Sequence, residues 1–301
     1  MESDAPAFRE FPPGHRSGYV TLVGRPNVGK STLMNALVGR KLSIVSEKPQ
    51  TTRHRTLGIL TGDAYQVIFL DTPGAIEPRY RLQESMMKAL GGALEEADLL
   101  LCMVEATDRE PDERLLSLAA ERPALLLLNK ADLVEEASLI PLVAAYDQRR
   151  QFLEIVPLSA LTGRNVELLR ELILAHLPEG PPYYPPEMIS EHPERFFVAE
   201  IIREKIFQTY RQEIPYSTQV NIVAFEEREG EKDFIDAEIV LESESQKPIV
   251  IGKKGEMLKR VGTLARRDIE EFLARPVFLQ LHVKVRKDWR RRDAFLRSYG
   301  Y

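Results

Sequence analysis

The stretch VGRPNVGKST, residues 23–32, decides the fold of this chain. It fits the pattern G-x-x-x-x-G-K-[ST] and follows an apolar run, YVTLV (19–23), of strand length. Glycine lets the backbone curl with its N–H groups turned inward, and the start of a helix favours anions. The stretch therefore predicts a phosphate-binding loop between a buried strand and a helix.

The residue types in this loop predict individual contacts with a nucleotide. Lys30 brings a positive charge to the terminal phosphates, and the hydroxyl of Ser31 binds magnesium. An eight-residue pattern also arises in plain glycine turns, but its position after a strand favours the nucleotide interpretation. The predicted phosphate-binding residues are Gly24, Asn27, Val28, Gly29, Lys30, Ser31, Thr32 and Gly74.

Four further apolar runs of strand length follow, at 65–70, 99–104, 124–129 and 152–159. They alternate with segments of helical spacing, as in a mostly parallel sheet buried on both faces. We predict an α/β domain over residues 18–178, preceded by a flexible leader, residues 1–17. The single cysteine, Cys102, lies inside one of these runs, so we expect it to be buried.

Two motifs that follow later strands predict further contacts with the nucleotide, one with its phosphates and one with its base. In DTPG (71–74), Asp71 can hold a magnesium-bound water, and the N–H of Gly74 can meet the terminal phosphate. In NKAD (129–132), the carboxylate of Asp132 accepts hydrogen bonds from N1–H and the N2 amine of guanine. Adenine offers neither donor there, so the pattern favours guanine.

The stretch SAL (159–161) reinforces the choice of guanine. The backbone N–H of Ala160 is expected to donate to the guanine carbonyl oxygen, while Asn129 and Lys130 brace the base-binding loop. Each motif alone could be an ordinary polar loop at a strand end, but all occur in order. The predicted guanine-binding residues are Asn129, Lys130, Asp132, Ser159, Ala160 and Leu161.

Together with PQTTRHR (49–55), these motifs resemble the five motifs of Ras-like GTPases, most closely those of the Era family, over residues 18–180. The resemblance implies a switch threonine that closes over magnesium and the terminal phosphate. Thr52 is favoured and Thr51 is the alternative, because the sequence does not fix the register. The implied metal ligands are Ser31, Thr52 and, through water, Asp71, and the implied catalytic residues are Lys30, Thr52, Gly74 and Asn27.

The position after DTPG bears on the rate of hydrolysis. Many Ras-like enzymes place a water-orienting glutamine there, whereas this chain has Ala75 and Ile76. We therefore expect slow intrinsic hydrolysis. The resemblance implies that Asn27 helps to bind potassium in place of an arginine finger; the alternative is that Asn27 only supports the turn.

A proline-rich stretch, residues 179–194, separates the first domain from residues 195–301. The latter predict helix, two strands, an apolar strand-like run at 248–251, a loop, a helix at 256–274 and a strand at 277–285. This order is typical of a smaller α+β domain. From Pro248 to Tyr301 the chain carries 14 lysines and arginines against 6 aspartates and glutamates, although its overall net charge is -5.

The second glycine-lysine loop, IGKKGE (251–256), lacks the residues of a nucleotide loop. A G-x-x-G turn in this frame predicts a KH domain, whose loop clamps about four nucleotides of single-stranded RNA; the alternative is an exposed turn. Residues 195–290 resemble the type II KH domain of the Era family. Trp289, Phe295 and Leu296 are better explained by packing. The predicted RNA-binding residues are Ile251, Gly252, Lys253, Lys254, Gly255, Lys259, Arg260, Lys284, Arg286, Lys287 and Arg290.

The sequence thus predicts a GTP-driven switch that uses Mg²⁺, with K⁺ as a further candidate, and binds RNA. The resemblance implies single-stranded ribosomal RNA near the 3' end of the small subunit, and a role in maturing the small ribosomal subunit. A constitutive RNA-binding scaffold and an ATP-dependent enzyme are alternatives; Ala75 leaves room for the first and Asp132 argues against the second. We expect a cytoplasmic monomer. Peripheral contact with the inner face of the cell membrane ranks lower, because no apolar face accompanies the basic tail.

Overall fold

The computed structural model describes residues 11–120 and 122–301, and in this part the first domain contains a six-stranded sheet ordered β2-β3-β1-β4-β5-β6. Strand β2 runs antiparallel to β3, and the remaining neighbours are parallel. The predicted, mostly parallel α/β sheet is confirmed. The strands are β1 (Arg16–Gly24), β2 (Thr56–Gly62), β3 (Tyr65–Asp71), β4 (Leu99–Glu105), β5 (Ala124–Asn129) and β6 (Glu154–Pro157).

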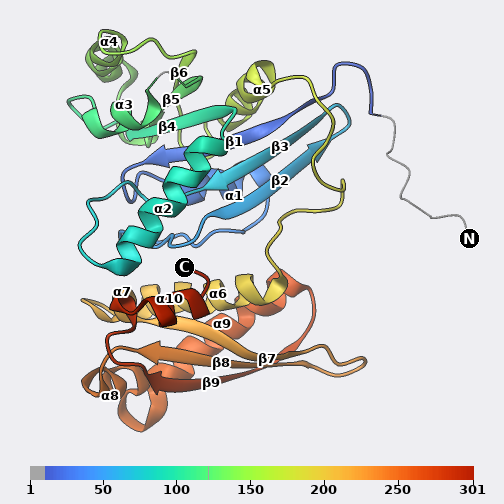
Figure 1. Cartoon of the computed structure of the whole chain (residues 1–301), viewed down its shortest axis with the longest axis vertical. Helices are drawn as coiled ribbons and strands as arrows, with labels where there is room; N and C mark the ends of the chain where they lie inside the picture. Colours follow the sequence, from blue (N-terminus) through green and yellow to red (C-terminus); the bar gives the residue numbers. More distant parts are fainter. Residues whose placement is uncertain (1–10, 121) are drawn as a thin grey trace, which may run out of the picture.

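Helices cover both faces of this sheet (Figure 1). Strand β5 is buried along its whole length and β4 is buried from Leu99 to Val104, as their continuous apolar runs predict, and Cys102 in β4 is fully buried. Burial raises the pKa of the Cys102 thiol to about 12, which disfavours the reactive thiolate and agrees with a packing role. The helices are α1 (Lys30–Val38), α2 (Arg81–Glu96), α3 (Glu113–Ala119), α4 (Ile140–Asp147) and α5 (Val166–His176).

The start of the first domain lies earlier than the sequence predicts. Residues 1–10 of the predicted leader lie outside the described residues, but Arg16 and Ser17 belong to β1, and Arg16 pairs with Tyr65 of β3. The polar side chain of Arg16 belongs at this strand end because its guanidinium donates to the carbonyl oxygen of Leu177, 2.5 Å away, at the end of α5. The leader therefore cannot extend to residue 17.

The proline-rich segment lies against the first domain along the outer strands of the sheet (Figure 1). The N–H of Ile59 in β2 donates to the carbonyl oxygen of Ile189 at 2.9 Å, and the hydroxyl of Ser190 donates to the carbonyl oxygen of Leu57 at 2.5 Å. The N–H of Tyr184 donates to the side chain of Gln66. The segment is thus docked along much of its length.

The second domain pairs a small sheet with two long helices. Strand β8 is antiparallel to β7 and parallel to β9, and α6 and α9 pack on the sheet through Ile202, Ile239 and Ile269. The predicted small α+β domain is confirmed. Its elements are α6 (Glu194–Thr209), α7 (Ile214–Ser217), β7 (Gln219–Glu226), β8 (Asp233–Leu241), α8 (Lys247–Ile251), α9 (Glu256–Leu273), β9 (Val277–Val285) and α10 (Asp293–Ser298).

The apolar run at 248–251 forms helix α8, so its prediction as a strand is wrong. Two local signals explain the helix. Pro248 occupies its first turn, where the missing N–H costs nothing, and Ser243 and Gln246 form a capping box just upstream. Gly252 ends the helix with a φ of 74°. The G-x-x-G turn therefore joins two helices.

The C-terminal tail lies between the two domains (Figure 1). Trp289 is fully buried and shares one apolar cluster with Leu82 and Met86 of α2, Val240 of β8 and Leu296 of α10. The packing role predicted for Trp289 and Leu296 is confirmed. In the described residues, no helix is both long enough and apolar enough to cross a bilayer.

Truncating Leu82 should destabilise the whole protein, because its 1% exposed side chain joins the two domains. We expect Leu82→Ala to lower the free energy of unfolding by about 2–5 kcal/mol. Urea denaturation followed by the fluorescence of Trp289 measures this change. The matched control Ile140→Ala removes a side chain that is 68% exposed and should change the free energy of unfolding by less than about 0.5 kcal/mol. Equal effects of the two substitutions would contradict the packing described.

Candidate nucleotide site and RNA-facing loop

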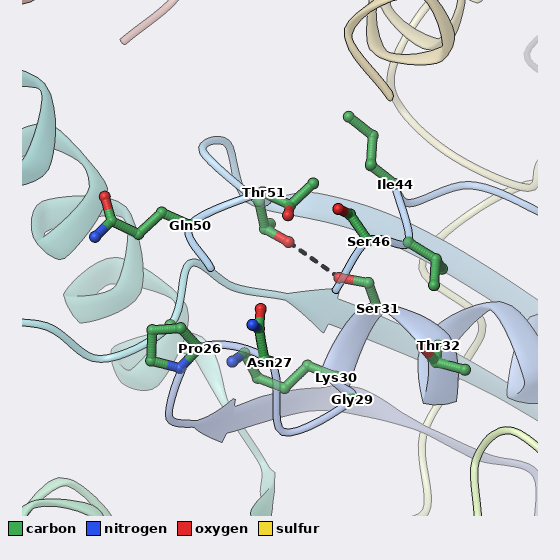
Figure 2. A pocket seen from close by; sticks show the side chains of 13 residues that line it. Pro26, Asn27, Gly29, Lys30, Ser31, Thr32, Ile44, Ser46, Gln50 and Thr51 are labelled. Atoms are coloured by element: carbon green, nitrogen blue, oxygen red, sulfur yellow. Dashed lines mark hydrogen bonds between the residues drawn. The ribbon is translucent and has the colours of Figure 1, made fainter. Parts of the chain in front are cut away.

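The phosphate-binding loop follows β1 and opens α1, as the sequence predicts. Gly29 adopts a φ of 103°, and a Cβ atom there would lie 2.2 Å from Nδ2 of Asn129. Only glycine satisfies both constraints. Asn27 and Lys30 of the loop line a pocket together with Thr32 of α1 and the residues around Thr51 (Figure 2).

Lys30 spans the loop from the inside. Its ammonium group donates to the carbonyl oxygens of Gly24 and Arg25, at 3.0 and 2.9 Å. The side chain is 6% exposed, and burial lowers the pKa of Lys30 to about 8. The ammonium is thus held at the phosphate end of the site, and no carboxylate of residues 11–120 or 122–301 is paired with it, which leaves its charge available to an anion.

Three predicted metal ligands lie together at the end of β3. The hydroxyl of Ser31 donates to Oδ2 of Asp71 at 2.7 Å, and the hydroxyl of Thr52 lies 3.0 Å from that of Ser31. The hydroxyl of Thr51 instead donates to the carbonyl oxygen of Lys48 at 2.7 Å. The structure therefore places Thr52, and not Thr51, beside Ser31 and Asp71.

The surroundings of the Asp71 carboxylate suit a bound cation. Its Oδ1 atom is buried and has no hydrogen-bond partner in the described part of the chain. Burial raises the pKa of Asp71, while the hydrogen bond from Ser31 opposes the shift. A buried carboxylate oxygen without a partner beside two hydroxyls is a donor set of the hard oxygen type that magnesium prefers.

Gly74 lies against the phosphate-binding loop. A Cβ atom at Gly74 would lie 2.7 Å from the backbone nitrogen of Pro26, so a larger residue would push the two loops apart. The N–H of Ala75 donates to the carbonyl oxygen of Gly24. Ala75 and Ile76 pack with apolar neighbours, in agreement with their inability to orient water.

The base side of the cleft is built around Asn129. Its amide donates to the carbonyl oxygen of Val28 at 2.7 Å and accepts from the N–H of Ala160 at 2.9 Å. Lys130 has a φ of 63° and donates to Glu105 at 2.6 Å. Both residues brace the loop as predicted, and they leave Asp132 exposed at the cleft.

One predicted contact on this side is different in the structure. The N–H of Ala160, expected to face the guanine carbonyl oxygen, is used by the side chain of Asn129. Because a buried amide left without a partner is costly, Asn129 satisfies it in this structure. Ala160 thus supports the cleft by packing and by joining its loops. Ser159 and Leu161 line the same cleft.

The cleft has lining residues that sequence reasoning missed. Phe207 and Gln208, near the end of α6 in the second domain, line it together with Glu47 and Lys48. No local pattern marks the two α6 residues, because their place in the site depends on how the domains dock. The nucleotide cleft is therefore shared by both domains.

The second glycine-lysine loop presents its charges to solvent. Gly252 has a φ of 74°, and a Cβ atom there would lie 2.5 Å from Cγ of Met257. Lys253 and Lys254 are exposed. A groove runs from Gly255 between α9 and β9, and its lining includes residues that the sequence did not single out. They are Leu258, Gly262, Thr263, Leu279 and Leu281, and they lie beside Lys259 and Arg266, two basic residues of α9 that the sequence does indicate for phosphate contact.

The predicted RNA-binding residues do not all join this groove. Ile251 is half-buried and Arg260 is exposed close to the loop, while Arg286 and Lys287 are exposed beyond β9. Lys284 is paired with Glu238 at 2.7 Å.

Arg290 lies elsewhere, so its assignment to the RNA surface is a misprediction. Its guanidinium pairs with Glu242 and lies 5.0 Å from the ring of Tyr80, between the two domains. The half-buried charge needs a carboxylate partner, and Glu242 supplies it.

Comparisons with known proteins agree with this geometry. The profile of the 50S ribosome-binding GTPase family matches residues 19–130, and that of the KH domain matches residues 213–290. GTPase Era of Geobacter metallireducens is 47% identical over 95% of this chain and 98% of its own length. The chain belongs to the Era family of GTPases.

Other Era-family proteins extend the similarity. The ERA-like chloroplastic GTPase of Arabidopsis thaliana is 48% identical over 95% of this chain and 69% of its own length. Era of Aquifex aeolicus, in a variant bound to GDP and AlF₄⁻, is 43% identical with a TM-score of 0.92 over 95% of this chain and 99% of its own. A second Era structure, in complex with MgGDPNP and nucleotides 1506–1542 of 16S ribosomal RNA, has the same TM-score, 42% identity and the same coverage.

Removing the Asn129 side chain should loosen the cleft of this Era-family chain even without nucleotide. In Asn129→Ala, the buried carbonyl of Val28 and N–H of Ala160 lose their partner, so we expect the free energy of unfolding to fall by about 2–4 kcal/mol. Urea denaturation of the nucleotide-free protein measures this loss. An unchanged midpoint without nucleotide, combined with weaker GDP binding, would mean that Asn129 acts only on the ligand.

Proposed function

We propose that this chain is a GTP-driven switch that binds single-stranded RNA near the 3' end of the small-subunit ribosomal RNA and acts in maturation of the small ribosomal subunit. The observation that carries the proposal is that one chain contains two glycine-lysine loops, each suited to binding phosphate groups. One opens a cleft with an exposed Asp132 at its base side, and the other, at Gly252 to Gly255, opens a groove between α9 and β9. The Era complex with 16S ribosomal RNA nucleotides supports the choice of RNA.

We assign nucleotide binding to the domain that ends near residue 178 and RNA binding to residues 195–301. The phosphates would be held by Lys30 and by backbone N–H groups of the loop and of Gly74. Asp132 would read guanine through N1–H and the N2 amine, because a carboxylate accepts both bonds. Asn129 and Lys130 would hold Asp132 in place.

Magnesium would be held by the hydroxyls of Ser31 and Thr52 and, through water, by Asp71. The ion supplies positive charge that offsets the charge developing on the phosphate oxygens. Lys30 adds a second positive charge, and its buried position strengthens that interaction. The unpartnered Oδ1 atom of Asp71 supports this assignment.

Intrinsic hydrolysis should be slow, because Ala75 cannot orient the attacking water. The Asn27 amide donates to the carbonyl oxygen of Glu47 at 2.5 Å, which supports the turn. Potassium binding by Asn27 stays a prediction. We also propose that the protein acts as a monomer in the cytoplasm. For the basic tail, contact with a membrane ranks below RNA binding.

The guanine assignment is tested by Asp132→Asn. An asparagine replaces one acceptor with a donor, so it faces the N2 amine of guanine with the wrong group and favours the carbonyl oxygen of xanthine. We expect GDP affinity to fall by about 100-fold or more and the affinity for xanthosine diphosphate to rise. Competition binding with GDP, ADP and xanthosine diphosphate measures both. Displacement of labelled GDP by ATP from the unsubstituted protein would instead support an ATP-dependent enzyme.

The RNA assignment is tested by substituting both loop lysines with serine. We expect Lys253→Ser with Lys254→Ser to weaken binding of a single-stranded oligonucleotide of the 16S 3' end by about tenfold. Affinity falls as salt rises, and the steepness of that fall, the slope of log affinity against log salt, should become shallower by about 1.4, because two phosphate contacts are lost. Fluorescence anisotropy at several salt concentrations measures both quantities.

The matched control carries Lys88→Ser and Lys232→Ser, two exposed lysines away from the loop. It removes the same net charge and should bind RNA like the unsubstituted protein. An equal loss in both double variants would reduce the effect to overall charge. Strong RNA binding without multiple-turnover GTP hydrolysis, even with small ribosomal subunits added, would favour a constitutive scaffold.

A further inference from the structure

The segment that carries Thr52 is held by the second domain on both sides. On one side, the carbonyl oxygen of Thr51 accepts a hydrogen bond of 2.6 Å from Nη2 of Arg203 in α6. On the other side, Arg53 donates into the second domain through its guanidinium. The two neighbours of Thr52 are therefore held by the second domain, Thr51 through its carbonyl oxygen and Arg53 through its side chain.

The side chain of Arg203 is oriented by contacts within its own helix, α6. Its side chain is 1% exposed, and its Nε donates to Glu200, one turn earlier on α6, at 2.8 Å. Its guanidinium also lies 5.4 Å from the ring of Phe207. Since a planar guanidinium held at Glu200 and stacked near a ring has little freedom left, Nη2 points at the carbonyl oxygen of Thr51.

Arg53 is buried, and within the described part of the chain no carboxylate forms an ion pair with it. Its guanidinium donates to the carbonyl oxygens of Thr218, Pro215 and Tyr216, at 2.8, 3.1 and 2.9 Å. These oxygens lie in and directly after the short helix α7, where they lack intrahelical partners. The same burial that lowers the pKa of Arg53 makes these bonds difficult to exchange for water.

Lys48 adds a third contact of the same kind. Its ammonium donates to the carbonyl oxygens of Phe207 and Tyr210, at the C-terminal end of α6. Helix ends leave such oxygens unpaired and attract cations. Residues 48, 51 and 53 therefore all contact the second domain, while the hydroxyl of Thr52 points the opposite way, to Ser31 and Asp71.

We propose that Arg203 is a positioning residue for GTP hydrolysis, acting from the RNA-binding domain through the Thr51 carbonyl to hold Thr52 over magnesium and the terminal phosphate. The inference rests on the proposed role of Thr52 and adds a residue to it. Arg203 would act through its contact with Thr51 and not by holding the nucleotide or the metal itself. Its effect is to reduce the conformational freedom that Thr52 loses when it engages magnesium.

The proposal also places regulation in the contact between the domains. Helix α6, which carries Arg203, packs against α9, and α9 begins at Glu256, directly after Gly255 of the RNA-facing loop. Asp268 of α9 pairs with Lys205 of α6 and, at 3.6 Å, with Lys41 of the first domain. A change in how α6 docks on the first domain would therefore move the support of Thr52.

The test compares full-length variants with the Arg203 contact removed or weakened. The first carries Arg203→Met with Glu200→Gln, so that no unpaired carboxylate stays buried. The second, Arg203→Lys, keeps the charge beside Glu200 but loses the fork that reaches two acceptors. The matched control is Arg195→Met, which removes an exposed arginine from the same helix.

We expect the double variant to lose about tenfold in kcat, or about 1.4 kcal/mol, and to need several-fold more magnesium for half-maximal rate. GDP affinity should stay within about twofold, because the base and loop contacts are untouched. Arg203→Lys should lie between, and the control should match the unsubstituted protein. Hydrogen exchange of residues 48–54 with a bound GTP analogue should rise in the double variant.

A folded double variant with unchanged kcat, magnesium requirement and exchange overturns the proposal. If the double variant fails to fold, Arg203→Lys decides: unchanged kcat and magnesium requirement overturn the proposal, and a loss of threefold or more in both supports it. RNA binding is measured in the same series. Its absence in the unsubstituted protein would remove the proposed function while leaving the result for Arg203 intact.

Discussion

The side-chain amide of Asn129 joins loops that are far apart in the chain, and the nucleotide cleft depends on it. It reaches the carbonyl of Val28, 101 residues earlier, and the N–H of Ala160, 31 residues later. The parallel sheet makes this possible, because the carboxyl ends of β1 and β5 lie at the same edge. Gly29 then has to be glycine, since the amide occupies the space where a side chain would begin.

Local sequence patterns are enough to predict those elements that have a characteristic run or spacing of residues. Apolar runs predicted β3, β4 and β5 closely, and the spacing of polar motifs predicted which strand ends meet. The run at 248–251 is ambiguous from its pattern because four apolar residues suit a strand as well as a buried helical turn, and the capping box just upstream is the local signal that favours the helix. Strand β2 was not predicted, as its residues, TLGILTG, give only a short mixed pattern.

Other features could not be predicted because they arise from contacts between domains. Phe207 enters the cleft only because α6 docks beside the switch segment, and Arg290 leaves the RNA surface only because Glu242 and Tyr80 meet it. The preference for Thr52 over Thr51 is similar: both are threonines in one stretch, and the hydrogen bonds of their hydroxyls separate them. Charge and residue type limit the candidates, while docking selects among them.

The docked proline-rich segment has a consequence for colloidal behaviour. Strand β2 is an outermost strand of the six-stranded sheet, and such a strand offers backbone groups on which another molecule can add its own strand. Here Ile189 accepts from the N–H of Ile59, and Ser190 occupies the carbonyl of Leu57. A tether rich in proline, which lacks the N–H needed to recruit further strands, thus shields the β2 edge of the sheet from self-association while it connects the two domains.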